Sequence, residues 1–374
     1  MNNKAIQDVL DAAVAAGGVP GLTAAVAWAD GSESYFAAGA RGAADPAAMT
    51  PETRFWIASC TKAITSAAAL QLVERGVLDL DAPLGERLPH LAAPRVLEGF
   101  DAAGQPRLRP LRKPITLRTL LTHTSGMAYD FCNADLTRHF AATGGGLATD
   151  LATLVFDPGE GWQYGTGIDA AGWMIEAATG QGLDAYFAEA ILGPLRMADT
   201  TFHPQDTPEH PSAALHTHTP DGAFAPLDMF AQPPLLWGGG GLFSTAPDYL
   251  KFLRAVMSDG AGVFGPQTLQ QLRQNQTGSL AAGELISASP AMSHDFRPMP
   301  GVDKRWTLGF LRNESDVPGG RLAGSLAWGG IANCYYWADP ASGVAGVMFA
   351  QFLPFADPQM LATFDAIERA VYAI

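Results

Sequence analysis

Positive charge is scarce in this chain. Its 374 residues carry 23 Lys and Arg against 37 Asp and Glu, which gives a formal net charge of −14 at pH 7. A surface with that excess of negative charge repels phosphate backbones and anionic lipid headgroups. We therefore expect neither a nucleic acid nor a membrane surface as a partner.

Long apolar runs and paired cysteines are also missing. No stretch reaches the ~18 apolar residues of a membrane span, and the N-terminal segment lacks the apolar core of a secretory signal, which predicts a cytoplasmic protein. Cys60, Cys132 and Cys334 are far apart and form no Cys-x-x-Cys pair. The cysteines therefore predict neither a disulfide framework nor a zinc knuckle, and we expect them to be small buried residues.

The two ends of the chain combine helical and strand patterns. Hydrophobic residues make up 48% of the sequence, as in an ordinary globular protein. Apolar spacing predicts an N-terminal helix, then a hairpin, then a helix buried on most sides that begins at Cys60. Near the other end it predicts strands over 322–328, 335–338 and 344–352, followed by a last helix over 358–372.

The middle of the chain has mainly helical patterns, at 117–121, 170–179 and 183–192. Residues 94–114 mix Pro, Gly and basic side chains, and we interpret them as a solvated excursion. The sequence thus predicts one sheet built from both chain ends, with an inserted helical domain. The expected division is 1–80 and 238–374 for the sheet domain, and 81–237 for the insertion.

Ser59 and Lys62 are the best candidates for chemistry. They are three residues apart at the start of the predicted buried helix, so they share a face. A lysine desolvated among alanines binds its proton less tightly and can help to activate a neighbouring hydroxyl. Chance alone gives about 0.2 Ser-x-x-Lys matches in such a sequence, so the spacing by itself is equally compatible with a serine N-cap and a lysine that extends to solvent.

Residues 53–62, TRFWIASCTK, resemble the active-site segment of the serine β-lactamase and penicillin-binding protein superfamily. Further segments resemble landmarks of that superfamily in the same order: LLTHTSG at 120–126, DPGE at 157–160, GPLRM at 193–197 and GGGLFSTA at 239–246. Because Trp328-Gly329-Gly330 occurs near the C-terminus, the chain is most similar to the β-lactamase-like carboxylesterases called family VIII. The resemblance implies an α+β fold of the β-lactamase/transpeptidase type, with an antiparallel sheet flanked by helices and no cofactor.

The resemblance also implies roles for individual residues. Ser59 would be the nucleophile, and Lys62 and Tyr164 would manage its proton, with Tyr164 as the general base. The backbone amides of Ser59 and Ile331 would form the oxyanion hole.

The sequence departs from the superfamily pattern at two positions. Thr166 stands where β-lactamases and peptidases usually carry an asparagine that contacts the substrate amide. Trp328 replaces the lysine that holds a substrate carboxylate, so carboxylate-bearing substrates should bind about ten- to a hundredfold more weakly. Both changes favour neutral esters. The expected substrate-binding residues are Trp328, Gly329, Gly330, Tyr129 and Trp237.

Other motifs are better explained by structure. His216 and His218 have no third ligand at metal spacing, so no metal site is expected. His123 has no Gly-x-Ser-x-Gly elbow to serve and is expected to cap or pack its turn. The glycine runs at 144–146 and 238–241 lack the Gly-Lys-Ser/Thr ending of phosphate loops and are interpreted as turns.

The sequence therefore predicts a cytoplasmic serine carboxylesterase that cleaves small neutral esters through an acyl-enzyme on Ser59, without cofactor or metal. The alternatives are a β-lactamase, D-amino-acid peptidase, amidase or acyltransferase of the same fold, and a non-catalytic substrate-binding protein. The acyl chain, the alcohol and the oligomeric state are left open, because one fold and catalytic core serve many chemistries.

Overall fold

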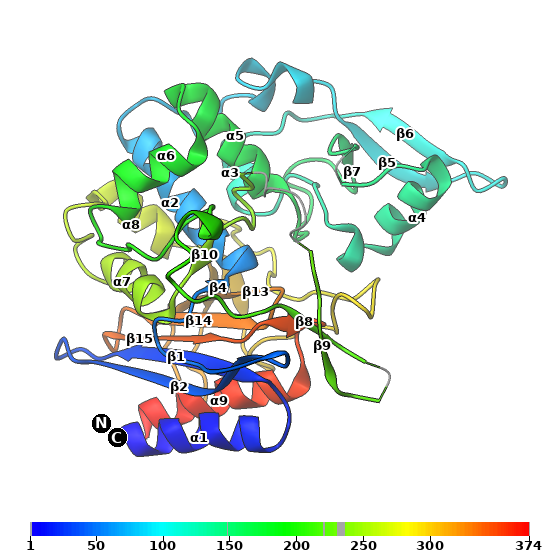
Figure 1. Cartoon of the computed structure of the whole chain (residues 1–374). Helices are drawn as coiled ribbons and strands as arrows, with labels where there is room; N and C mark the ends of the chain where they lie inside the picture. Colours follow the sequence, from blue (N-terminus) through cyan, green and yellow to red (C-terminus); the bar gives the residue numbers. More distant parts are fainter. Residues whose placement is uncertain (1, 148, 220, 230–235, 374) are drawn as a thin grey trace.

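The centre of the molecule is an antiparallel sheet made from both ends of the chain (Figure 1). A computed structural model describes residues 2–147, 149–219, 221–229 and 236–373. Over these residues the sheet has eight strands, in the order β11-β12-β13-β14-β15-β1-β2-β3. The strands are β1 (Gly21–Ala27), β2 (Glu33–Gly42), β3 (Asp45–Ala48), β11 (Lys304–Trp306), β12 (Leu311–Asn313), β13 (Leu326–Gly330), β14 (Cys334–Asp339) and β15 (Val344–Phe349).

Helices cover both faces of this sheet. α1 (Asn3–Ala15) and α9 (Pro358–Tyr372) lie side by side on one face, and α7 (Ala246–Met257) packs on the other against β1, β14 and β15 (Figure 1). The central β14 and β15 are buried along their whole length, so they consist mostly of apolar residues rather than alternating polar and apolar ones.

α2 (Thr61–Glu74) is a core helix next to the sheet. Every residue from Thr61 to Leu72 is buried, and the helix contacts α5 (Gly167–Thr179) and α8 (Pro266–Arg273). The prediction of a helix buried on most sides is confirmed. The turn that precedes α2 is therefore held between the sheet and the helical part of the molecule.

The remaining elements form the helical part and small sheets around it. The helices are α3 (Leu117–Leu121), α4 (Ala134–Thr143) and α6 (Leu183–Phe187), with short turns η1 (Ala58–Cys60), η2 (Leu84–Glu86), η3 (Pro89–Leu91), η4 (Asp130–Cys132), η5 (Ala188–Leu192) and η6 (Pro204–Asp206). The small sheets pair β4 (Phe55–Trp56) with β10 (Phe243–Ser244), β5 (Arg95–Phe100) with β6 (Pro106–Pro110) and β7 (Thr153–Leu154), and β8 (His216–His218) with β9 (Phe224–Pro226) and β16 (Phe352–Leu353).

The predicted α+β class and the sheet built from both chain ends are confirmed. Residues 94–114 are mostly exposed or half-exposed, as a solvated excursion should be, but β5 and β6 pair there as a hairpin that the sequence analysis did not predict. Arg109 in this hairpin donates to Asp157 with nitrogen–oxygen distances of 2.5 and 3.1 Å, so part of the basic cluster is paired. The domain division at 80/81 and 237/238 stays a prediction. Among the described helices, none is long and apolar enough to cross a bilayer.

Candidate active site

Ser59 lies in the turn η1 that enters α2. The residue before it, Ala58, has a φ of 45°, in the left-handed region that costs a non-glycine residue free energy. η1 packs against β13, where a Cβ on Gly330 would lie 2.3 Å from the carbonyl oxygen of Ile57. The sequence analysis placed Ser59 in the first turn of the helix; it lies instead one turn earlier, and its side chain remains half-buried at a cavity.

Lys62 is completely enclosed, and three polar groups surround its ammonium group. Its Nζ donates to Ser59 Oγ at 3.2 Å, to the Tyr129 hydroxyl at 3.0 Å and to the carbonyl oxygen of Gly239 at 2.6 Å. Burial lowers its pKa to about 8, and the nearby Asp169 carboxylate opposes the decrease. Such a lysine exchanges its proton near neutral pH, as an acid or base acting on Ser59 must.

Tyr164 lies on the other side of Lys62. The Lys62 Nζ is 4.8 Å from the centre of the Tyr164 ring, and the Trp328 ring packs against the tyrosine at a centroid distance of 5.0 Å. Burial raises the pKa of Tyr164, and its neighbours Ser59 and Trp328 offset only part of that rise. Within the described part of the chain, no hydrogen bond of normal geometry reaches its hydroxyl. A phenolate there requires the positive charge of Lys62.

Three groups that the sequence analysis did not assign to catalysis meet behind Lys62. Tyr129, predicted only as a pocket residue, donates to Asp169 Oδ2 at 3.4 Å, and the N–H of Gly239 donates to Asp169 Oδ1 at 2.8 Å. We expected the 238–241 segment to be a turn only, but its Gly239 also binds Asp169 through the backbone N–H and Lys62 through the carbonyl oxygen. The sequence analysis missed Asp169 because acidic residues are common in the first turn of a helix, where they favourably oppose the helix dipole.

A cavity of about 640 Å³ opens directly on Ser59. Tyr129, Tyr164, Trp328, Gly329 and Ile331 line it, together with apolar side chains that include Phe131, Leu147, Leu151, Trp173, Leu285 and Met292. The structure therefore gathers the predicted nucleophile and most of the predicted substrate-binding residues around one largely apolar space.

The other predicted pocket residues lie at different depths. Trp237 lines the cavity but is 51% exposed, which places it at the mouth. Trp328 is buried in an aromatic cluster with Trp306 and Tyr164. Gly330 packs against Ile57 rather than lining the cavity. Ser59 and Ile331 face the cavity from adjoining elements, as the predicted oxyanion hole requires.

His216 and His123, two histidines considered in the sequence analysis, are held by contacts within the fold. The N–H of Ala43 donates to His216 Nε2 at 2.9 Å, and His216 Nδ1 lies 3.3 Å from the carbonyl oxygen of Gln351, so both ring nitrogens have partners in the protein. Among the described residues, no group of three His, Cys, Asp or Glu side chains is arranged to hold a metal ion. His123 is buried beside Tyr164 and Trp306, and burial keeps its pKa well below the ordinary value. The three cysteines are free and buried.

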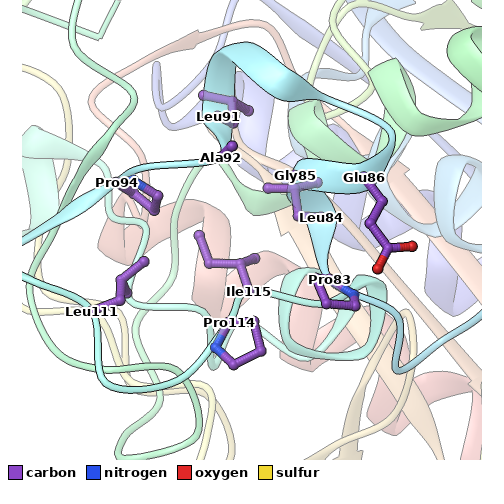
Figure 2. Close-up of a pocket in the computed structure, with 10 residues that line it drawn as sticks. All are labelled: Pro83, Leu84, Gly85, Glu86, Leu91, Ala92, Pro94, Leu111, Pro114 and Ile115. Carbon is purple, nitrogen blue, oxygen red and sulfur yellow. The ribbon is translucent and has the colours of Figure 1, made fainter.

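A second, smaller cavity of about 260 Å³ lies between η2, η3 and the segment that leads into α3 (Figure 2). Its lining consists mainly of Pro, Leu and other apolar side chains, and Glu86 is the one titratable residue among those that Figure 2 labels. It lacks the nucleophile and acid–base groups that the larger cavity brings together.

Comparison with known proteins identifies the family. The beta-lactamase family model matches residues 6–369. The chain belongs to the beta-lactamase family. The predicted superfamily and its β-lactamase/transpeptidase-like fold are therefore confirmed, and the chain is an enzyme of the serine beta-lactamase fold.

Relatives of this beta-lactamase family member include acyltransferases and an esterase. It is 36% identical over 337 residues to the monacolin J acid methylbutanoyltransferase of Aspergillus terreus, covering 85% of this chain and 81% of the relative. It is 31% identical to the lovastatin esterase of Penicillium rubens, with 82% of each chain covered. The unliganded simvastatin synthase (LovD) of Aspergillus terreus superposes with a TM-score of 0.86 at 31% identity, covering 100% of this chain and 98% of the other.

Proposed function

We propose that this chain is a serine acyltransferase that carries a small acyl group on Ser59 and passes it to a hydroxyl of a bulky, largely apolar acceptor. The observation that carries the proposal is the cavity of about 640 Å³ on Ser59, whose apolar walls provide more space than a small ester requires. Water is the competing acceptor, and its use would make the same enzyme a carboxylesterase.

The first half of the reaction forms the acyl-enzyme. Ser59 Oγ attacks the carbonyl carbon of an ester or thioester donor while Lys62 and Tyr164 take the hydroxyl proton. The amides of Ser59 and Ile331 stabilise the negative oxygen of the tetrahedral intermediate. When the intermediate collapses, the bond to the leaving oxygen or sulfur breaks, and the leaving group receives the proton.

In the second half the acceptor replaces the leaving group. An acceptor hydroxyl in the cavity gives its proton to the same Lys62 and Tyr164 pair and attacks the acyl carbon. The bond between Ser59 Oγ and the acyl carbon then breaks, and the pair returns a proton to Oγ, which restores the free hydroxyl. Apolar walls favour transfer over hydrolysis because they bind the acceptor in place and exclude the water that competes with it.

The relatives support transfer more strongly than hydrolysis. Of the two relatives compared above, the Aspergillus terreus methylbutanoyltransferase is the more similar one, at 36% identity. The esterase that the sequence analysis predicted remains a second candidate, because the Penicillium rubens relative that bears this name is 31% identical over a comparable length.

The test measures how the acyl-enzyme partitions between alcohol and water. The enzyme is incubated with p-nitrophenyl 2-methylbutanoate, with and without monacolin J acid, and mass spectrometry quantifies the transferred ester and the free acid. We expect the transferred ester to exceed the free acid at saturating acceptor, with neither formed by Ser59→Ala. Release of free acid alone at every acceptor concentration would contradict the transferase proposal and support the esterase function instead.

A further inference from the structure

Asp169 is a buried carboxylate in the first turn of α5 that has no directly bonded lysine or arginine. Its residue is 8% exposed, and no salt bridge within 4.0 Å joins it to a basic side chain of the described chain. Its oxygens accept instead from the hydroxyl of Tyr129 and the N–H of Gly239. A buried carboxylate is costly unless a nearby positive charge compensates it, and Lys62 is the cation that acts on it.

Both partners of Asp169 are also partners of Lys62. Tyr129 accepts from Lys62 Nζ and donates to Asp169, while Gly239 offers its carbonyl oxygen to Lys62 and its N–H to Asp169. The four residues form a closed ring of hydrogen bonds. Because an ammonium group is tetrahedral, fixing two of its N–H bonds on this ring directs the third towards Ser59 Oγ, where a bond of 3.2 Å is found.

The space around Gly239 shows that the ring is closely packed. A Cβ on Gly239 would lie 2.4 Å from Asp169 Oδ2, so a side chain at this position would displace the carboxylate. The glycine is therefore required by the carboxylate beside it, and the 238–241 segment is positioned by Asp169 as well as by its own backbone.

Asp169 also differs in charge from the other titratable groups that face Lys62. Cys60, Cys132, Tyr129 and Tyr164 come from four segments of the chain, and burial raises the pKa of each, which keeps them uncharged near neutral pH. Burial also keeps His123 uncharged. Burial also raises the pKa of Asp169, but the charge of Lys62 and the bonds from Gly239 and Tyr129 oppose that rise. Among these groups, Asp169 is therefore the one that supplies negative charge opposite the ammonium group.

We propose that Asp169 is a positioning residue that, through Tyr129 and Gly239, directs Lys62 towards Ser59 and by its charge strengthens the affinity of Lys62 for its proton. The contribution of Asp169 to catalysis rests on the proposed function. Its effect on the protonation of Lys62 is a property of the folded protein and does not depend on which reaction the enzyme catalyses. An experiment can therefore contradict the proposed function without contradicting the role of Asp169, and the reverse.

The first experiment titrates Lys62 directly. The chain has five lysines, so a protein labelled with ¹³C at lysine Cε gives few NMR signals, and Lys62→Arg identifies the one from Lys62. We expect Asp169→Asn, which retains the shape of the side chain without its charge, to move the titration midpoint of Lys62 to lower pH by about one unit, a tenfold weaker affinity for the proton. Asp130→Asn removes a carboxylate at the same cavity outside the ring and should leave the midpoint unchanged.

An unchanged Lys62 midpoint in folded Asp169→Asn overturns the proposal, whatever reaction the enzyme catalyses. If Asp169→Asn does not fold, Tyr129→Phe becomes the deciding variant. It keeps the charge of Asp169 but removes the hydroxyl that links Asp169 to Lys62. We expect it to lower kcat and to move the midpoint less than Asp169→Asn does. An unchanged midpoint together with an unchanged kcat in Tyr129→Phe would also overturn the proposal.

The second experiment follows acyl transfer against pH. In Asp169→Asn, the limb of the kcat/KM profile that depends on Lys62 should move to lower pH with the NMR midpoint. A merely structural role for Asp169 would reduce the rate and the thermal stability without moving that limb, and would overturn the proposal. Absence of activity in the wild type would contradict the proposed function and leave the NMR result to decide the role of Asp169.

Discussion

At the scale of single residues, the site depends on one local spacing and several distant contacts. The interval of three residues between Ser59 and Lys62 places their side chains together in any helical turn, so the sequence alone predicted this pair. No spacing could predict that Asp169 and Gly239, far apart in the chain, complete the environment of the same lysine. The role of Tyr129 was underestimated for the same reason, because its partners belong to two other helices.

The simplest residue-scale prediction concerns the nucleophile. Ser59→Ala should reduce acyl transfer and ester hydrolysis by about three orders of magnitude or more, because the acyl-enzyme cannot form. The melting temperature should change little, since the lost hydroxyl lies half-exposed at the cavity. Steady-state rates and intact mass after treatment with a serine-reactive phosphonate measure the effect.

Ser66→Ala is the matched control for this change. Ser66 is a buried serine of α2 whose hydroxyl has no hydrogen-bond partner among the described residues, so its removal should retain activity. Phosphonate labelling of Ser59→Ala at the wild-type rate would place the nucleophile elsewhere.

At the scale of elements, long periodic segments were predictable and short irregular ones were not. The helix expected over 358–372 coincides with α9, because its apolar spacing and its N-terminal proline are both local signals. The hairpin of β5 and β6 was missed, since prolines and glycines that usually mark loops occur within it. The hairpin is held in part by contacts with residues distant in the sequence, such as the ion pair between Arg109 and Asp157.

A buried ion pair fixes α9 to the segment before β13. Arg321 donates to both carboxylate oxygens of Glu368, and both side chains are almost fully buried. Glu368→Gln leaves the guanidinium without a counter-charge, so we expect the free energy of unfolding at pH 7 to fall by about 3 kcal/mol in urea denaturation. Asp8→Asn, which breaks an exposed pair with Lys4, should change it by less than about 0.5 kcal/mol.

The same pair predicts a pH dependence. Burial raises the pKa of Glu368, but Arg321 outweighs burial, and the net pKa lies below the ordinary value. The stabilisation is therefore present above the unfolded pKa of about 4.3 and is lost as pH falls through the lower folded value. Wild type and Glu368→Gln should converge in stability in acid, and a gap that widens below pH 4 would contradict this assignment.

At the scale of the whole molecule, the proposed reaction uses only side chains and backbone amides gathered around one cavity. We therefore expect exhaustive EDTA treatment to leave the rate of acyl transfer unchanged. The measurement compares initial rates before chelation, after it and after addition of zinc. A loss of activity that zinc restores would give His216 and His218 a role that their present contacts do not suggest.

The side-by-side packing of α1 and α9 has a consequence for engineering. The first helix begins and the last helix ends at the same edge of the molecule, on the face of the sheet away from α2 (Figure 1). A short linker could therefore join the two ends, and new termini could be opened in the exposed turn between β5 and β6. In such a circular permutant every strand of the central sheet would come from one uninterrupted stretch of chain, and the helical part would be divided between its flanks.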